Sequence, residues 1–230
     1  MPIYQFPHIQ QSHDGREQQV HSYILSQPSL KGNPSAILAA MDEFSGQKEF
    51  LISLGENKAK ILTEMIIAEK PKVFVEVGGY VGYSAILVGD TMRSYDTKAQ
   101  VWSLELEKQF ATIIEELVEF AGLSDVVKVV VGPASDSLRA MKADGRIDQP
   151  DFYLIDHVEE LYVSEFRTIE SLGCLKVGAV IVADNVVRPG APKYREFVRH
   201  HDRLRSEGVL CLITPGGLEV CLELVESFQY

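Results

Sequence analysis

The chain has 230 residues, of which 46% are hydrophobic and 24% are charged. A chain of this length and composition can fold around its own core, which excludes disordered, fibrous and small disulfide-scaffold classes. Acidic residues outnumber basic residues by 33 to 22, for a formal net charge of −11, and this charge repels the phosphate backbone of nucleic acids. We therefore expect one soluble globular domain over residues 1–230, with no nucleic-acid partner.

The cysteines and the apolar runs predict where the protein resides. Cys174, Cys211 and Cys221 lack CxxC spacing and lie in or near apolar runs, so we expect reduced core residues in a reducing compartment. No apolar run approaches the ~20 residues of a membrane span, and residues 1–8 have neither the basic nor the apolar region of a secretion signal. These features predict a cytoplasmic protein that does not enter a membrane.

The first 50 residues are predicted to form an N-terminal helical arm, in which polar stretches interrupt the apolar spacing. Helical cores are expected at residues 24–25 and 37–41, the second following Asn33 as N-cap and Pro34 in the first turn. Helical spacing returns at residues 56–69, where a Lys-Pro dipeptide ends it.

After this arm, short apolar runs alternate with amphipathic segments. The predicted strands are residues 73–77, 101–105, 126–131, 152–155 and 179–183. The predicted helices are residues 83–92, 108–121, 134–143 and 163–172. This alternation is typical of right-handed βαβ units around a buried parallel sheet. Residues 209–213 and 218–224, with a turn at 214–217, are expected to form an antiparallel hairpin that closes the sheet.

The turn after the first predicted strand has the composition of a ligand-binding loop. Gly78 and Gly82 permit a tight turn, and Ser84 lies near the start of the next helix, where negative groups are favoured. A dinucleotide fingerprint is disfavoured, because Tyr80 stands where its second glycine belongs. A purely structural turn is the alternative. Glu105, at the end of the second strand, favours a site because its carboxylate can bind a ribose diol, although a solvated strand end is its other interpretation.

Two further strands end in acidic residues, Asp156 and Asp184, which His157 and Asn185 follow. Neighbouring strands lie about 4.8 Å apart, so these side chains can meet at one end of the sheet. Two carboxylates and an amide oxygen are hard donors that suit Mg²⁺, and the sequence has no His/Cys cluster for zinc. Helix capping is the alternative for each aspartate, and His157 is equally explained as a structural hydrogen-bonding residue.

Several motifs, in order and spacing, resemble those of the catechol O-methyltransferases, a family of magnesium-dependent class I enzymes that use S-adenosylmethionine. The motifs are VFVEVGGYVGYSA, SLELE, FAGLSDVVKVVVGPASD, DFYLIDH and GAVIVADNVVRPGAP, and the resemblance covers residues 50–198. It implies a Rossmann-like α/β fold with a seven-stranded, mostly parallel sheet, a reversed last strand and helices on both faces.

The resemblance also implies a set of site residues. Those that would bind the cofactor are Leu54, Glu76, Gly78, Tyr80, Ser84, Glu105, Ser135, Asp156 and His157. Asp156, Asp184 and Asn185 would be the ligands of the magnesium ion, and Phe50, Asn185 and Pro189 would contact the substrate.

The chain departs from the family at three points. Glu159 stands where the family has a catalytic lysine, Val158 replaces an aromatic residue, and the C-terminal carboxylate that holds a second catechol hydroxyl has no clear counterpart. With the metal lowering the pKa of a phenol, Glu159 or Lys193 could serve as the base.

The expected function is Mg²⁺-assisted methyl transfer to a catechol-like small molecule. The alternatives are methylation of another phenol or diol in secondary metabolism, and a catalytically degenerate protein that only binds the cofactor. The expected partner is a small aromatic diol or phenol, and the expected assembly is a monomer or a weak homodimer.

Overall fold

The computed structural model describes residues 12–212 and 218–228. Its α-helices are α1 (Arg16–Leu25), α2 (Pro34–Gln47), α3 (Gly55–Glu69), α4 (Tyr83–Arg93), α5 (Lys108–Phe120), α6 (Ala134–Ala143), α7 (Tyr162–Ser171) and α8 (Pro192–Arg199). Its strands are β1 (Val73–Val77), β2 (Gln100–Glu105), β3 (Val127–Val131), β4 (Phe152–Ile155), β5 (Val180–Ala183), β6 (Leu204–Leu212) and β7 (Leu218–Ser227). Short helical turns form η1 (Pro28–Leu30), η2 (Glu159–Leu161) and η3 (Val186–Gly190).

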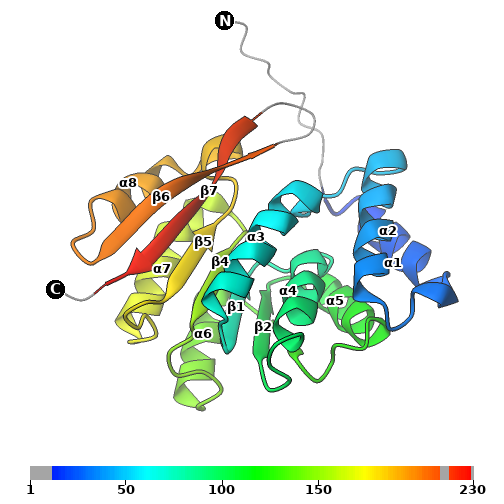
Figure 1. Cartoon of the computed structure of the whole chain (residues 1–230), viewed down its shortest axis with the longest axis horizontal. Helices are drawn as coiled ribbons and strands as arrows, with labels where there is room; N and C mark the ends of the chain where they lie inside the picture. The colour runs from blue at the N-terminus through cyan, green and yellow to red at the C-terminus, as the bar shows by residue number, and fades with distance from the viewer. Residues whose placement is uncertain (1–11, 213–217, 229–230) are drawn as a thin grey trace, which may run out of the picture.

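The strands form one sheet in the order β3-β2-β1-β4-β5-β7-β6. Strands β1 to β5 run parallel to one another, whereas β7 is antiparallel to both β5 and β6. In Figure 1, β6 and β7 lie on the side of the molecule away from α1 and α2. The predicted seven-stranded, mostly parallel sheet with a reversed last strand is therefore confirmed.

Helices cover both faces of this sheet, as predicted, and each face has its own core. Phe74 and Phe152 lie in the core that residues of α1 to α5 complete, and Val75 and Tyr153 lie in the core completed by α6, α7 and α8. This division follows from strand geometry, because successive side chains of a strand point to opposite faces. The strands in the middle of the sheet are buried on both sides, so their carboxyl ends are held by packing in front and behind.

Most of the predicted elements are found with small changes. β1, β4 and α6 have the predicted bounds, α7 is shifted by one residue at both ends, and the other predicted strands and helices of residues 56–183 differ by one residue at one end. The predicted N-cap is confirmed, since the Asn33 side chain accepts a hydrogen bond from the Ala36 N–H at 3.2 Å. Helix α8 was not predicted, because it has only eight residues, most of them polar, and only Tyr194 and Val198 are fully buried.

The predicted hairpin is found as β6 and β7, both longer than expected. Residue 213 and the predicted turn at 214–217 lie outside the described residues, as do residues 1–11 of the predicted arm.

The prediction that all three cysteines are reduced is wrong for two of them. Cys211 in β6 and Cys221 in β7 form a disulfide, with their Cα atoms 6.1 Å apart. The pair joins neighbouring antiparallel strands across ten positions of sequence, a relation that a search for CxxC spacing does not detect. Cys174 is buried and unpaired, as predicted.

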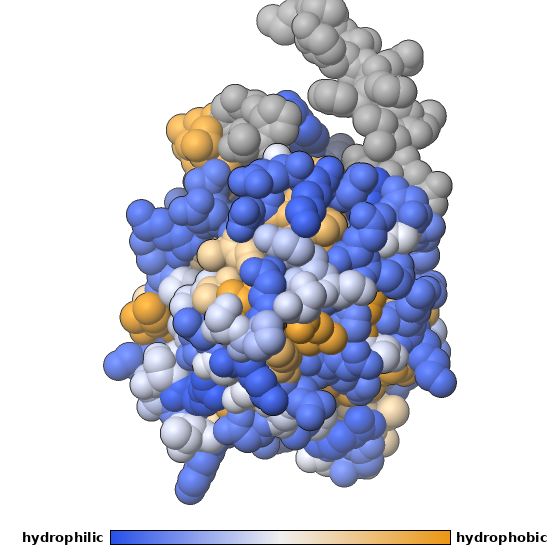
Figure 2. Space-filling model, turned by 90° about the vertical axis from the view of Figure 1, so that its right-hand side faces the viewer, coloured by the Kyte–Doolittle hydropathy of each residue, from blue (hydrophilic) through white to orange (hydrophobic). Residues whose placement is uncertain are grey.

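One face of the molecule illustrates the character of the surface. The face on the right-hand side of Figure 1 is mainly hydrophilic, with small scattered hydrophobic areas (Figure 2). Among the described residues, no helix combines the length and the apolar character that crossing a membrane requires.

Two helical glycines offer a matched test of the packing between α4 and β3. A Cβ added at Gly89 would lie 2.5 Å from Val127 Cγ2, whereas one added at Gly46 in α2 would meet nothing within 4 Å. We expect Gly89→Ala to lower the free energy of unfolding by about 1–3 kcal/mol through overpacking. Gly46→Ala should raise it by about 0.5–1 kcal/mol, because alanine favours helix. Urea unfolding measures both, and a neutral Gly89→Ala would contradict this packing.

Candidate functional site

The loop after β1 touches the loop after β4. Gly78 has φ +97°, in the left-handed region, and a Cβ at this position would lie 2.3 Å from the backbone oxygen of Asp156. No residue other than glycine fits such an approach without moving one of the two loops. Gly78 therefore holds the first strand-to-helix turn against the strand end that carries Asp156, and Gly82 (φ +85°) ends the same turn at the start of α4.

Glu105 fixes the shape of this loop from the neighbouring strand. Its Oε2 accepts hydrogen bonds from the backbone N–H groups of Gly79 at 3.1 Å and Tyr80 at 2.9 Å. Its Oε1 accepts one from the N–H of Glu107 at 2.8 Å. The carboxylate is almost fully buried, so these three donors compensate the loss of water around its charge. Tyr80 in turn donates its hydroxyl hydrogen to Glu17 of α1 at 3.1 Å.

Glu76 lies on β1, beneath the loop, and is fully buried. Ser103 of β2 donates a hydrogen bond to its Oε1, and burial raises the pKa of Glu76 to about 7. Within the part of the chain that the structure describes, Oε2 of Glu76 has no hydrogen-bond partner. A buried oxygen of this kind is a place for a donor from a bound molecule. Ser84, also predicted here, is buried in the first turn of α4.

His157 follows Asp156 and stacks on Tyr162, with ring centroids 5.4 Å apart. Burial lowers the pKa of His157 to about 4, so the imidazole is neutral at pH 7. Neither ring nitrogen has a hydrogen-bond partner among the described residues. Nearby, Ser135 donates its hydroxyl hydrogen to Glu165 at 2.6 Å, which ties the start of α6 to α7. His157 Nε2 also lies 3.9 Å from Glu165 Oε1, beyond hydrogen-bond distance. The histidine nitrogens thus remain buried without hydrogen bonds among the described residues, whereas the Ser135 hydroxyl is bonded to Glu165.

Asp184 and Asn185, at the end of β5, meet Asp156, at the end of β4, as the sequence predicts. Asn185 Nδ2 lies 3.3 Å from Asp156 Oδ1, and Asp184 Oδ1 accepts a hydrogen bond from the Asn185 N–H at 2.7 Å. Lys58 of α3 joins them, with its Nζ 2.7 Å from each carboxylate oxygen of Asp184 and 3.0 Å from Asn185 Oδ1. Burial and the neighbouring Asp184 raise the pKa of Asp156 well above its usual range.

These residues fit a hard divalent cation. Two carboxylates and an amide carbonyl supply oxygen donors, and the Lys58 ammonium bound to Asp184 and Asn185 shows that the position accepts positive charge. In the described ranges no three His, Cys, Asp or Glu side chains gather as a metal-binding group, so a metal here depends on the Asn185 oxygen.

A cavity of about 440 Å³ opens beside this cluster. Its walls include Phe50, Leu54, Lys58, Asp184, Asn185 and Pro189. Leu54, immediately before α3, is buried.

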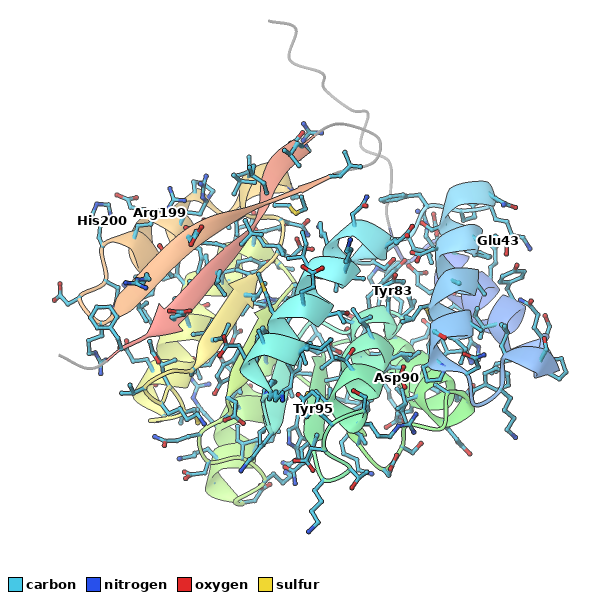
Figure 3. All side chains as sticks on the ribbon, in the orientation of Figure 1. Glu43, Tyr83, Asp90, Tyr95, Arg199 and His200 are labelled. Atoms are coloured by element: carbon cyan, nitrogen blue, oxygen red, sulfur yellow. A yellow bond between two sulfur atoms is a disulfide. The ribbon has the colours of Figure 1, made fainter. Side chains whose placement is uncertain are left out.

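The rest of the cavity wall is built from polar pairs. Arg188 and Glu219 form an ion pair at 2.6 Å within it. Asp42 of α2, a further wall residue, accepts a hydrogen bond from the Tyr83 hydroxyl at 2.8 Å; Figure 3 shows Tyr83 between α4 and α2. Helices α2 and α3 and the β6–β7 hairpin thus enclose a space beside Asp184.

The two predicted bases occupy different surroundings. Glu159 lies in η2, half-buried, and burial together with the nearby charges of Glu160 and Asp184 raises its pKa. Asp184 is therefore close enough to Glu159 for its charge to affect the pKa of this carboxyl. Lys193 is exposed in the first turn of α8.

Lys58 is the residue that sequence reasoning missed. Its partners Asp184 and Asn185 are 126 and 127 residues away, and no local pattern predicts such a contact. One signal was available: Lys58 follows Leu54 by four positions, which puts both residues on one face of a helix that begins there.

The buried Glu76 generates a prediction on pH dependence. Its pKa is raised from 4.5 to about 7 in the folded protein, so the folded state holds a proton that the unfolded state has lost. Stability from this group is present below pH 4.5 and falls as the pH rises towards 7. Glu76→Gln, which cannot ionise, should gain on the order of 3 kcal/mol over the wild type across this range.

Urea unfolding at a series of pH values measures this difference between the two proteins. Exposed Glu64 of α3 provides the control, and Glu64→Gln should follow the wild type. A constant difference between Glu76→Gln and the wild type from pH 4 to 8 would show that Glu76 does not titrate in this way.

Comparison with known proteins agrees with this geometry. Residues 31–203 match the family model described as O-methyltransferase. The chain is 35% identical over 188 residues to catechol O-methyltransferase from Bos taurus, covering 82% of this chain and 68% of that protein. It is 30% identical over 184 residues to catechol O-methyltransferase from Mus musculus, covering 80% of this chain and 68% of the relative.

A solved structure shows the same fold. The O-methyltransferase from Bacillus cereus in complex with SAH (S-adenosylhomocysteine) superposes with a TM-score of 0.70 at 22% identity, over 91% of this chain and 97% of that one. The resemblance inferred from the motifs is confirmed by the family model and by the two catechol O-methyltransferases, and so is the prediction of an enzyme. This chain belongs to the O-methyltransferase family.

Proposed function

We propose that this protein transfers a methyl group from S-adenosylmethionine to a hydroxyl of a catechol-like small molecule, with Mg²⁺ bound by Asp156, Asp184 and Asn185. One observation carries the proposal: Asp184 and Asn185 line the same cavity as the apolar side chains of Phe50 and Pro189. A flat aromatic ring suits such walls, and its hydroxyl groups can approach the part of the wall that carries Asp184 and Asn185.

The cofactor part of the proposal is supported by polar groups that lack partners. Glu76 Oε2 and both nitrogens of His157 are buried and unbonded within the described residues, and S-adenosylmethionine carries an ammonium group, hydroxyl groups and an adenine to meet them. In this proposal the methionine portion contacts Leu54, Glu76, Gly78, Tyr80 and Ser84. The ribose contacts Glu105, and the adenine lies near Ser135 and His157. The Bacillus cereus relative binds the corresponding product, SAH.

Methyl transfer from a sulfonium is an in-line displacement, so the main task of the protein is to hold the acceptor oxygen and the methyl group in line and in contact. Phe50 and Pro189 would orient the ring, and the Gly78–Asp156 contact would fix the cofactor loop relative to the acceptor site. When bound, Mg²⁺ would supply the Lewis acidity that lowers the pKa of the acceptor hydroxyl. Glu159, whose own pKa is raised by burial, is the proposed acceptor of the released proton.

Two measurements test the proposed function. Isothermal titration with S-adenosylmethionine should show saturable binding. Transfer of labelled methyl to a panel of catechols, other phenols and aliphatic diols should occur with catechols when Mg²⁺ is present and fall sharply with EDTA. Cofactor binding without transfer to any acceptor would favour the degenerate alternative. Equal rates with and without EDTA would remove the metal from the proposal.

Glu105→Ala tests the cofactor site. The variant should weaken S-adenosylmethionine binding by about 1–3 kcal/mol, because the ribose and the loop N–H groups of Gly79 and Tyr80 lose a charged acceptor together. Glu107→Ala is the control. It removes an exposed carboxylate but keeps the backbone N–H that donates to Glu105. Isothermal titration compares the three proteins, and an unchanged affinity in Glu105→Ala would place the ribose elsewhere.

Asp184→Ala tests the metal site. We expect it to abolish Mg²⁺-dependent turnover while cofactor affinity stays within about twofold, since the carboxylate is proposed to bind the ion and not the cofactor. The exposed Asp202 supplies the control variant, Asp202→Ala, which should retain wild-type rates. Full Mg²⁺-stimulated activity in Asp184→Ala would move the metal site to other residues.

A further inference from the structure

Lys58 makes three hydrogen bonds to the group formed by Asp156, Asp184 and Asn185, all of them to Asp184 and Asn185. Its ammonium bonds Asp184 Oδ1 and Oδ2 at 2.7 Å each and Asn185 Oδ1 at 3.0 Å. A lysine ammonium has three N–H donors, so all of its hydrogen-bonding capacity is directed at this one site. The side chains of Lys58 and Asp184 are only 12% and 2% exposed. This pair is therefore shielded from water, unlike a surface ion pair.

The oxygens that Lys58 binds are those that the proposed metal would need. Asp184 Oδ1 also accepts the backbone N–H of Asn185, which leaves little of its lone-pair capacity for a second cation. An ion that coordinates Asp184 and Asn185 must therefore compete with the ammonium for the same oxygens, and two cations at one site repel each other.

We propose that Lys58 is the resident cation of this site and that a divalent metal binds by displacing its ammonium group. The inference rests on the proposed metal site and adds a positioning role for a residue of α3. In this arrangement Lys58 keeps Asn185 turned with its oxygen towards the cation position and its Nδ2 towards Asp156. The ligand set is thus ordered before metal arrives.

The displaced ammonium has a place to go. Lys58 lines the cavity of about 440 Å³ together with Asp184 and Asn185, so its flexible four-carbon side chain can swing into this space without moving α3. The cavity wall also carries Glu56 and Asp42, which offer the released charge new acidic neighbours.

The first test measures metal affinity directly. Mn²⁺ is titrated into the full-length protein and the free ion is followed by electron paramagnetic resonance, for the wild type, Lys58→Met and Lys60→Met. Lys60 is two residues further along α3 and exposed, so its variant removes the same charge from the same helix without touching the site. Lys58→Met should bind Mn²⁺ about tenfold more tightly or better, and Lys60→Met should stay within about threefold of the wild type.

Equal or weaker Mn²⁺ binding in Lys58→Met, with a wild-type circular dichroism spectrum, would overturn the inference. Absence of Mn²⁺ binding to every variant would overturn it as well, together with the metal part of the proposed function. Titration with S-adenosylmethionine would still judge the cofactor part separately.

The second test needs no variant and stands even if Lys58→Met fails to fold. Wild-type protein is labelled briefly with acetic anhydride, with and without saturating Mn²⁺, and the modification of each lysine is quantified by mass spectrometry. Release of the ammonium from Asp184 should raise labelling of Lys58 several-fold, with Lys60 as the internal reference. Unchanged or reduced labelling of Lys58 in the presence of Mn²⁺ would overturn the exchange.

Discussion

Burial of carboxyl groups at one end of a parallel sheet is the constraint on which the rest of the site depends. Glu76 on β1, Glu105 on β2, Asp156 after β4 and Asp184 after β5 all lie at the carboxyl end of adjacent strands. Removing an ionised carboxylate from water is costly unless hydrogen bonds or a counter-charge compensate it. Glu105, Glu76 and Asp184 meet this cost in three different ways, and each way gives the group a different chemistry.

The solutions divide the site into two halves. Glu105 is compensated by backbone N–H groups, so it stays bound to the loop and shapes the region proposed for the cofactor. Glu76 has Ser103 on one oxygen and a pKa near neutrality, which makes it a group that can accept a hydrogen bond from a ligand. Asp184 is compensated by a cation, Lys58. Hydrogen bonds therefore compensate the carboxyl groups on the side proposed for the cofactor, and an ion pair compensates Asp184 on the side proposed for the acceptor.

The elements of this architecture could be predicted, because apolar runs of strand length and turn residues are local signals. Asp156 and Asp184 could be brought together in advance as well, since β4 and β5 are parallel neighbours and their ends must coincide. What could not be predicted depends on contacts across the chain. The Lys58 ion pair, the packing of α8 through two residues, and the register that brings Cys211 to Cys221 each require knowledge of which segments lie side by side.

Glu159, which stands where the family resemblance implies a lysine, affects the charge balance around Lys58. The resemblance to the catechol O-methyltransferases implies a lysine at this position, and a glutamate changes the local charge by two units. Burial raises the pKa values of Asp156, Asp184 and Glu159, and the charge of Asp184 adds to the shifts of the other two. The Lys58 ammonium is bonded to Asp184. A single positive charge leaves such a cluster undercompensated, whereas a divalent ion neutralises two carboxylates at once. In the proposed exchange of the Lys58 ammonium for a metal, a glutamate at position 159 in place of a lysine would increase the electrostatic gain.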